Sequence, residues 1–198
     1  MEDLKRANKA INKLTEKPIK IKFPKLTGSL GIEVFSDASF RNLPDQISSG
    51  RGHIVFLTGG GRAAVIGWNS NKVKRVVGST VAAEALSLKM VLDHRHFLRA
   101  ILAEIMNVEM KSIPMIAHVD SKNLYEAIRS TKFVEDKKLR LDIAQIQEAV
   151  TTENVEIKWV PTGEMIADCL TKRGVKTDKI LENLETGYIE KGETEKME

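Results

Sequence analysis

The spacing of apolar residues changes along the chain from a period of two to a helical period. Alternating or apolar strand-like runs are expected over residues 30–37, about 52–58 and about 63–69. The triplet Gly59–Gly61 lies between the last two runs and predicts a hairpin turn. Three strands joined by short links predict an antiparallel meander.

Beyond this meander, helical and strand-like segments alternate. A long helix is expected from Thr80 to about Met106, and its predicted apolar stripe consists of Ala85, Leu88, Leu92, Ile101 and Ile105. The later segments are a strand over 115–120, helices over about 121–128 and 136–150, a strand over 154–160 and a closing helix over about 164–172. The order β-β-β-α-β-α-α-β-α predicts an α/β fold with a five-stranded mixed sheet and helices on both faces.

The two ends of the chain look different from this central region. Residues 1–28 combine a helical pattern over 3–14 with an alternating, exposed strand-like run over 19–23, and we interpret them as a connector. Residues 29–174 form the predicted domain. Residues 175–198 form a charged tail, with a weak helix near 180–184 that then frays.

Composition narrows the classes of protein. The chain is 42% hydrophobic, which is enough for a core, but no run reaches the roughly 18 apolar residues of a membrane span, so no membrane partner is expected. The single cysteine, Cys169, excludes an intramolecular disulfide and favours a reducing, intracellular setting. The formal charge of +4 is compatible with a polyanionic partner.

Four acidic residues stand where a carboxylate is costly. Asp37 and Asp120 end apolar strand-like runs, Glu84 lies in an Ala/Leu-rich helical run, and Asp168 lies in an apolar helical stretch. A buried carboxylate costs several kcal/mol unless a cation compensates it. If the four converge, they make a site for hard divalent cations and hence for phosphodiester chemistry.

Each acid also has a simpler interpretation. Asp37 could cap a turn, Asp120 could cap the following helix while also binding a metal, and Glu84 and Asp168 could face solvent. His118 shares a predicted strand face with Asp120 but lies further down the strand, and we expect it to be a packed core histidine. The order strand-Asp, helix-Glu, strand-Asp, helix-Asp favours the metal site.

Four sequence blocks carry a family resemblance. They are Val34–Ser39, Trp68–Glu84, His118–Asn123 and Val160–Lys172, the last with the sequence V-P-T-G-E-M-I-A-D-C-L-T-K. In this order they resemble the ribonuclease H (RNase H) domain of Ty1/copia-type retrotransposon polyproteins. The resemblance covers about residues 29–174, and the second and fourth blocks are the most diagnostic.

The resemblance implies a function and its site. Asp37, Glu84, Asp120 and Asp168 would be the catalytic metal ligands for two Mg²⁺ ions, with Mn²⁺ as a substitute. The substrate would be the RNA strand of an RNA/DNA hybrid, cut to leave a 3′-hydroxyl and a 5′-phosphate. The partner would be the reverse transcriptase domain of the same polyprotein, to which residues 1–28 would connect. The expected location is the cytoplasm, with virus-like particles as one setting.

Polar and basic residues near these acids are candidate contacts to nucleic acid. RNA/DNA hybrids offer a wide minor groove with 2′-hydroxyls, which suits polar side chains and phosphate contacts. The candidates are Ser39, Asn42, Ser121 and Asn123, with Lys72, Lys74 and Arg75 for backbone phosphate. The alternative for the three basic residues is a solvated loop.

Two departures and two rival functions stay open. Many RNases H carry a histidine in the loop before the final helix, but here that loop is Pro161–Glu164, so water activation would depend on the metals or on Glu164. Asp142 is a rival for the fourth acid, because copia-type domains have an aspartate on the matching helix; otherwise it is a buried structural acid.

The rival functions are an inactive RNase H-fold module that binds nucleic acid or a polymerase, and a transposase or exonuclease of the same fold.

Overall fold

The sheet has five strands in the order β3-β2-β1-β4-β5. The computed structural model describes residues 1–43, 47–131 and 134–189. β1, β2 and β3 form an antiparallel meander, and β4 pairs in parallel with both β1 and β5. The predicted mixed sheet is therefore confirmed. The strands are β1 (Gly31–Ser39), β2 (Gly50–Gly59), β3 (Arg62–Lys72), β4 (Met115–Val119) and β5 (Val155–Trp159).

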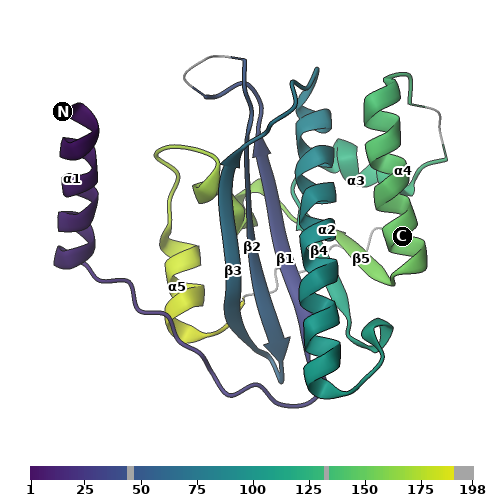
Figure 1. Ribbon diagram of the computed structural model, residues 1–198, viewed down its shortest axis with the longest axis horizontal. Coiled ribbons are helices and arrows are strands. Elements are labelled where there is room, and N and C mark those ends of the chain that lie inside the picture. Colours follow the sequence, from purple (N-terminus) through teal and green to yellow (C-terminus); the bar gives the residue numbers. More distant parts are fainter. Residues whose placement is uncertain (44–46, 132–133, 190–198) are drawn as a thin grey trace.

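Helices cover both faces of the sheet. The α-helices are α1 (Glu2–Glu16), α2 (Thr80–Met106), α3 (Lys122–Arg129), α4 (Lys137–Thr152) and α5 (Asp178–Thr186), and the 3-10 helices are η1 (Met110–Ser112), η2 (Thr162–Glu164) and η3 (Ile166–Leu170). α2, α3 and α4 pack together on one face, and η3 and α5 lie against the other. Figure 1 shows α2 running along the sheet, with α5 on the opposite side.

β1 is the centre of the core because both of its faces are covered. All nine of its residues are buried. Alternate side chains point to opposite faces of a strand. Ile32 and Val34 accordingly join the apolar cluster beneath α2 and α4, whereas Phe35 joins the cluster formed with η3 and α5. The polar residues of β1 are therefore held inside the molecule, and Asp37 is one of them.

The second half of α2 buries arginines where the prediction placed isoleucines. The helix has the predicted bounds, and Leu88 and Leu92 are buried, but Ile101 and Ile105 are 38% and 75% exposed. Arg95 and Arg99 face inward instead. They continue the helical spacing from Leu92, and their guanidinium groups reach backbone carbonyls, including Lys111 O at 3.2 Å from Arg99 Nη2.

Two local predictions near the ends of the domain are wrong. The closing segment 164–172 contains the last residue of η2 and the 3-10 helix η3 rather than one α-helix. The run 19–23 is not a strand; the N–H of Lys22 donates a hydrogen bond to Leu184 O, before the end of α5, at 2.8 Å. η3 packs against the sheet through Ile166 and Ala167, which join the apolar cluster around Phe35.

The proposed domain limits remain a prediction, although both flanking regions have a place in the fold. α5 contributes Ile180 and Leu184 to the apolar cluster on the η3 face, so part of the predicted tail packs against the sheet. α1 buries none of its residues and stands apart from the sheet (Figure 1). Residues 190–198 lie outside the described residues. None of the helices in the described ranges has both the length and the apolar character to cross a membrane.

Candidate metal centre

Asp37 and Asp120 come from neighbouring parallel strands. Phe35 pairs with His118 in the register of β1 and β4, so the two aspartates, two residues further on, are level with each other. Asp37 is fully buried, and Asp120 is half-buried just past the end of β4. The hydroxyl of Ser121, not Asp120, caps α3 by accepting a hydrogen bond from Leu124 N at 3.3 Å. The carboxylate of Asp120 is therefore not used as a helix cap.

Asp168 reaches the same point from η3 on the far side of β1. Two side chains fasten this segment to the sheet through its backbone carbonyls: Ser70 Oγ donates to Leu170 O at 2.6 Å, and Asn42 Nδ2 donates to Thr171 O at 2.9 Å. The glycine at position 52 of β2 permits the close approach, because a Cβ there would lie 2.6 Å from Leu170 Cβ. The absence of a side chain on β2 thus allows η3 to bring Asp168 against β1.

Three of the four predicted acids converge. One carboxylate oxygen from each of Asp37, Asp120 and Asp168 lies within 4.8 Å of the others. Asp37 and Asp168 are 131 positions apart in the sequence, so the fold, and not local sequence, brings them together. An all-oxygen donor set at this spacing suits a hard divalent cation.

Glu84 lies beside this group rather than within it. It is 4% exposed, near the start of α2, and the backbone N–H of Ala38 hydrogen-bonds its carboxylate. Burial, followed by the negative charges of Asp37 and Asp120, raises the pKa of Glu84 to about 9. The fourth predicted acid is therefore close enough to the centre to interact with two of its carboxylates.

The carboxylate of Asp37 is also destabilised in its charged form. Burial raises the pKa of Asp37 to about 6, and the charges of Asp168 and Asp120 contribute to the rise. The hydroxyl of Thr171 donates to Asp37 Oδ2, which opposes the shift, as does the charge of Lys172. Within the described part of the chain, Asp37 Oδ1 and Glu84 Oε2 are buried oxygens without a hydrogen-bond partner. A divalent cation would satisfy such oxygens, so the residues fit a metal ion.

These pKa shifts predict that the metal-free protein loses stability as the pH rises. A carboxyl whose pKa is higher in the folded state binds more protons there, so its contribution is present below the unfolded value of 4.5 and is lost as the pH rises through about 9. We expect the melting temperature in EDTA to fall between pH 5 and pH 9, and Glu84→Gln to reduce that fall. A Glu84→Gln variant that melts below the parent at pH 9 would contradict this prediction.

Lys172 is a residue of the centre that the sequence interpretation missed. Its Nζ lies 2.6 Å from Asp168 Oδ1 and 3.6 Å from Asp37 Oδ1. Burial lowers the pKa of Lys172, but the hydrogen bond to Asp168 and the charge of Asp37 outweigh it, so the pKa is above its ordinary value. Lys172 ends the fourth sequence block, four residues after Asp168. Residues four positions apart lie on one face of a helical turn, so this spacing could have indicated that Lys172 lies beside Asp168.

The residues predicted to contact nucleic acid have varied surroundings, and that role remains a prediction for all of them. Ser39 is buried and donates to Asn42 Oδ1 at 2.6 Å, and Asn42 in turn supports the Thr171 carbonyl. Ser121 caps α3. The exposed candidates are Asn42, Lys72, Lys74 and Asn123. The buried Ser39 therefore holds the side chain of the exposed Asn42, which in turn holds the segment after Asp168.

The seventh candidate, Arg75, is paired with an acid. It donates to the carboxylate of Asp142, which is 2% exposed and also has Lys89 Nζ at 3.7 Å. Asp142 is not part of the three-acid group. Its surroundings are those of a buried structural acid, which fastens the loop before α2 to α4. This finding weighs against Asp142 as the fourth acid of the centre.

His118 packs beneath the centre as predicted. Its ring stacks on Phe35 with a centroid distance of 4.3 Å, and its Nε2 lies 3.1 Å from Glu33 Oε2. The residue is 8% exposed. Together with Phe35 it forms an aromatic layer below Asp37 and Asp120.

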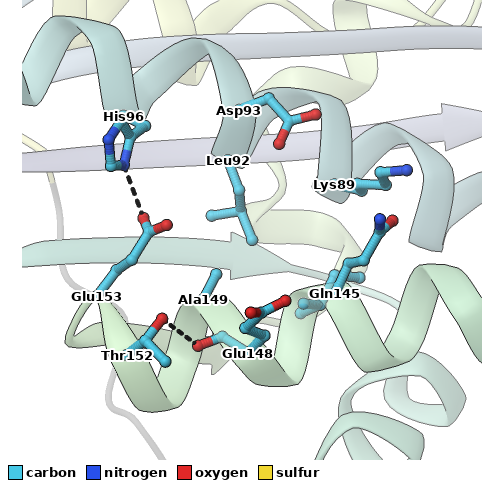
Figure 2. A pocket seen from close by; sticks show the side chains of 10 residues that line it. Lys89, Leu92, Asp93, His96, Gln145, Glu148, Ala149, Thr152 and Glu153 are labelled. Atoms are coloured by element: carbon cyan, nitrogen blue, oxygen red, sulfur yellow. Dashed lines mark hydrogen bonds and ion pairs between the residues drawn. The ribbon is translucent and has the colours of Figure 1, made fainter.

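A separate cavity of about 530 Å³ lies between α2 and α4. Figure 2 shows His96 of α2 facing Glu153, with Nδ1 and Oε2 3.1 Å apart, while Asp93 and Lys89 extend along the same side of α2. The carboxylates around this cavity do not form a group that could hold a metal ion among the described residues. The candidate centre is therefore the one at the carboxyl ends of β1 and β4.

Comparisons with known proteins agree with this geometry. No protein-family model matches the chain. Two curated relatives from Arabidopsis thaliana are similar over 150 residues, which is 76% of this chain: the retrovirus-related Pol polyproteins from transposon RE2, 27% identical, and from transposon RE1, 26% identical. The chain spans about 10% of the length of these relatives.

Solved structures share the fold. LC11-RNase H1, isolated from compost, aligns with a TM-score of 0.53 and 17% identity over 76% of this chain and 98% of its own; it has also been solved in complex with an RNA/DNA hybrid. The N-terminal RNase H domain of a Mycobacterium tuberculosis protein aligns with a TM-score of 0.50 and 21% identity over 72% of this chain and 91% of its own. The chain has the RNase H fold, and its resemblance to retrotransposon polyproteins is confirmed.

Proposed function

We propose that this chain is the RNase H domain of a Ty1/copia-type retrotransposon polyprotein and hydrolyses the RNA strand of an RNA/DNA hybrid. The observation that supports it most is the carboxylate group Asp37, Asp120 and Asp168, whose oxygens lie within 4.8 Å on an RNase H fold. The relationship to transposon Pol polyproteins supports the same reading. The partner would be the reverse transcriptase domain of that polyprotein, in the cytoplasm or in virus-like particles.

The residues of the centre would perform distinct tasks. Asp37, Asp120 and Asp168 would hold two Mg²⁺ ions, with Glu84 completing the set from α2. Ions bound in this way can lower the pKa of a bound water and stabilise the attacking and leaving oxygens of an in-line displacement. The buried strand β1 fixes Asp37, and the hydrogen bonds from Ser70 and Asn42 fix the segment that carries Asp168 and Thr171.

A hybrid substrate is supported by the surface around the centre. Lys72 is the exposed last residue of β3, and Lys74 lies two residues beyond it. Gly50 of β2 pairs with Lys72 on one side and with Ser39 of β1 on the other, so these lysines lie at the end of the sheet where β1 ends. Ammonium groups placed there could contact backbone phosphates while the acids address the scissile bond. The complex of LC11-RNase H1 with an RNA/DNA hybrid is a precedent within the same fold.

A cleavage assay tests the proposal. With labelled RNA/DNA hybrid and Mg²⁺ or Mn²⁺, we expect the RNA strand to be cut to products with 5′-phosphates, and we expect EDTA to abolish cutting. Labelled DNA duplex and RNA duplex serve as matched controls and should remain intact. Tight hybrid binding without any cleavage would instead support the inactive module, and cleavage of the DNA duplex would support a transposase-like or exonuclease activity.

A further inference from the structure

The centre already contains a positive charge supplied by the chain itself. Lys172 Nζ lies between two of the three converging acids, at 2.6 Å from Asp168 Oδ1 and 3.6 Å from Asp37 Oδ1. Asp37 Oδ1 is the same buried oxygen that has no hydrogen-bond partner among the described residues. The ammonium group therefore lies against the oxygens that a metal ion would use.

We propose that Lys172 is a displaceable counter-ion, which neutralises the acids when no divalent ion is bound and must withdraw from Asp37 and Asp168 when one binds. This inference rests on the proposed function, because it requires the acids to be a metal site. It assigns to Lys172 a direct effect on metal affinity. It also explains how closely spaced carboxylates are accommodated in the metal-free fold, since buried like charges repel unless they are compensated.

The side chain of Lys172 is able to leave. It is 36% exposed, so solvent already reaches it, whereas Asp37 is 1% exposed and held inside β1. A lysine has a flexible four-carbon stem and a strongly hydrated head group, which favours withdrawal into water. Thr171 differs, because its hydroxyl is bonded to Asp37 and lies 3.2 Å from Asp168 O. The neighbouring threonine can thus stay in place while the lysine moves.

Competition for the same oxygens has a measurable consequence. A metal ion that binds to Asp37 and Asp168 must break the 2.6 Å contact of Lys172, so part of its binding free energy is spent on displacing the ammonium group. Removing the ammonium group should therefore strengthen metal binding, although it weakens the metal-free protein. A residue that merely supported the fold would weaken both.

The test is calorimetric titration of the full chain with MgCl₂ and with MnCl₂, beside thermal melting in EDTA. For Lys172→Met we expect the dissociation constant for the metal to fall roughly fivefold, the upper end of the scale for an ion pair that solvent reaches, and the melting temperature in EDTA to fall. Lys172→Arg keeps the charge and should bind metal as the parent does. Arg173→Met removes the same charge from the next, exposed residue and should leave the affinity close to that of the parent.

The possible outcomes separate this inference from the proposed function. A parent chain that binds metal, with Lys172→Met binding equally or more weakly, overturns the counter-ion role and leaves the metal site intact. A parent chain that binds no metal overturns both. If Lys172→Met does not fold in EDTA, the change in metal affinity can be measured with Lys172→Gln, in a titration that begins from the metal-loaded protein. A metal affinity of Lys172→Gln no higher than that of the parent again overturns the proposal.

Discussion

Asp120→Asn is expected to lower the rate of RNA cleavage on the order of 10³-fold while the fold and hybrid binding persist. Asp120 belongs to the group of oxygens within 4.8 Å, and the amide removes its negative charge without changing its shape. Single-turnover cleavage of a labelled hybrid measures the loss.

The structure gives three reasons why Asp120→Asn should leave the protein folded. The backbone carbonyl of Asp120 accepts the hydrogen bond from Trp159 Nε1 at 3.0 Å, so that contact survives the substitution. Ser121, not Asp120, caps α3. Removing one of several like charges also relieves repulsion when no metal is bound. Asp93→Asn, at an exposed site on α2, is the matched control and should cleave like the parent. Cleavage by Asp120→Asn near the rate of the parent, or a large fall in its melting temperature, would count against the site.

Asp142→Asn is expected to have the opposite effect. It should lower the free energy of unfolding by about 2 kcal/mol and leave the rate of RNA cleavage unchanged. Asp142 is buried and contacts two cations, Arg75 and Lys89. Removing one partner of a fully buried pair costs about 3–5 kcal/mol, but these cationic side chains are 36% and 27% exposed, so water compensates part of the loss.

Urea unfolding of four proteins measures this second prediction. The parent, Asp142→Asn, Arg75→Met and the double variant form a cycle, in which a coupling free energy above about 0.5 kcal/mol confirms the pair. Asp168→Asn provides the contrast, because it should lose cleavage without a comparable loss of stability. If Asp142→Asn abolished cleavage at full stability, Asp142 would have to be a member of the centre after all.

The aspartates of this chain also show what the sequence could and could not predict. Asp37 and Asp120 were predictable because each ends a strand whose alternation is clear, and parallel neighbours bring such ends together. Asp142 was ambiguous, because an acid beside Leu139 and Ile143 is equally consistent with a buried ion pair or a ligand. Its partner Arg75 lies 67 positions away, and one sequence gives no signal for such a pairing.

The segments that were predicted wrongly are those whose structure depends on tertiary contacts. Hydrophobic periodicity predicted the bounds of α2, but it assigned isoleucines to the inner face because arginine is seldom fully buried. Arg95 and Arg99 are buried nonetheless, since long side chains can reach carbonyls at the ends of neighbouring segments. The closing segment has helical composition, but packing against the sheet beside Gly52 makes it a 3-10 helix. Lys172 was overlooked because a lysine side chain is usually solvated.

The way in which η3 is anchored gives the centre two unequal halves. Asp37 is immobilised by a strand buried along its whole length, whereas Asp168 is carried by a five-residue turn attached through the Leu170 and Thr171 carbonyls. We expect a cation with a larger ionic radius to be accommodated by a small shift of the turn, without any change in the strand register. We therefore expect the tolerance of such a centre for divalent ions of different radius to depend on the two hydrogen bonds that hold the turn.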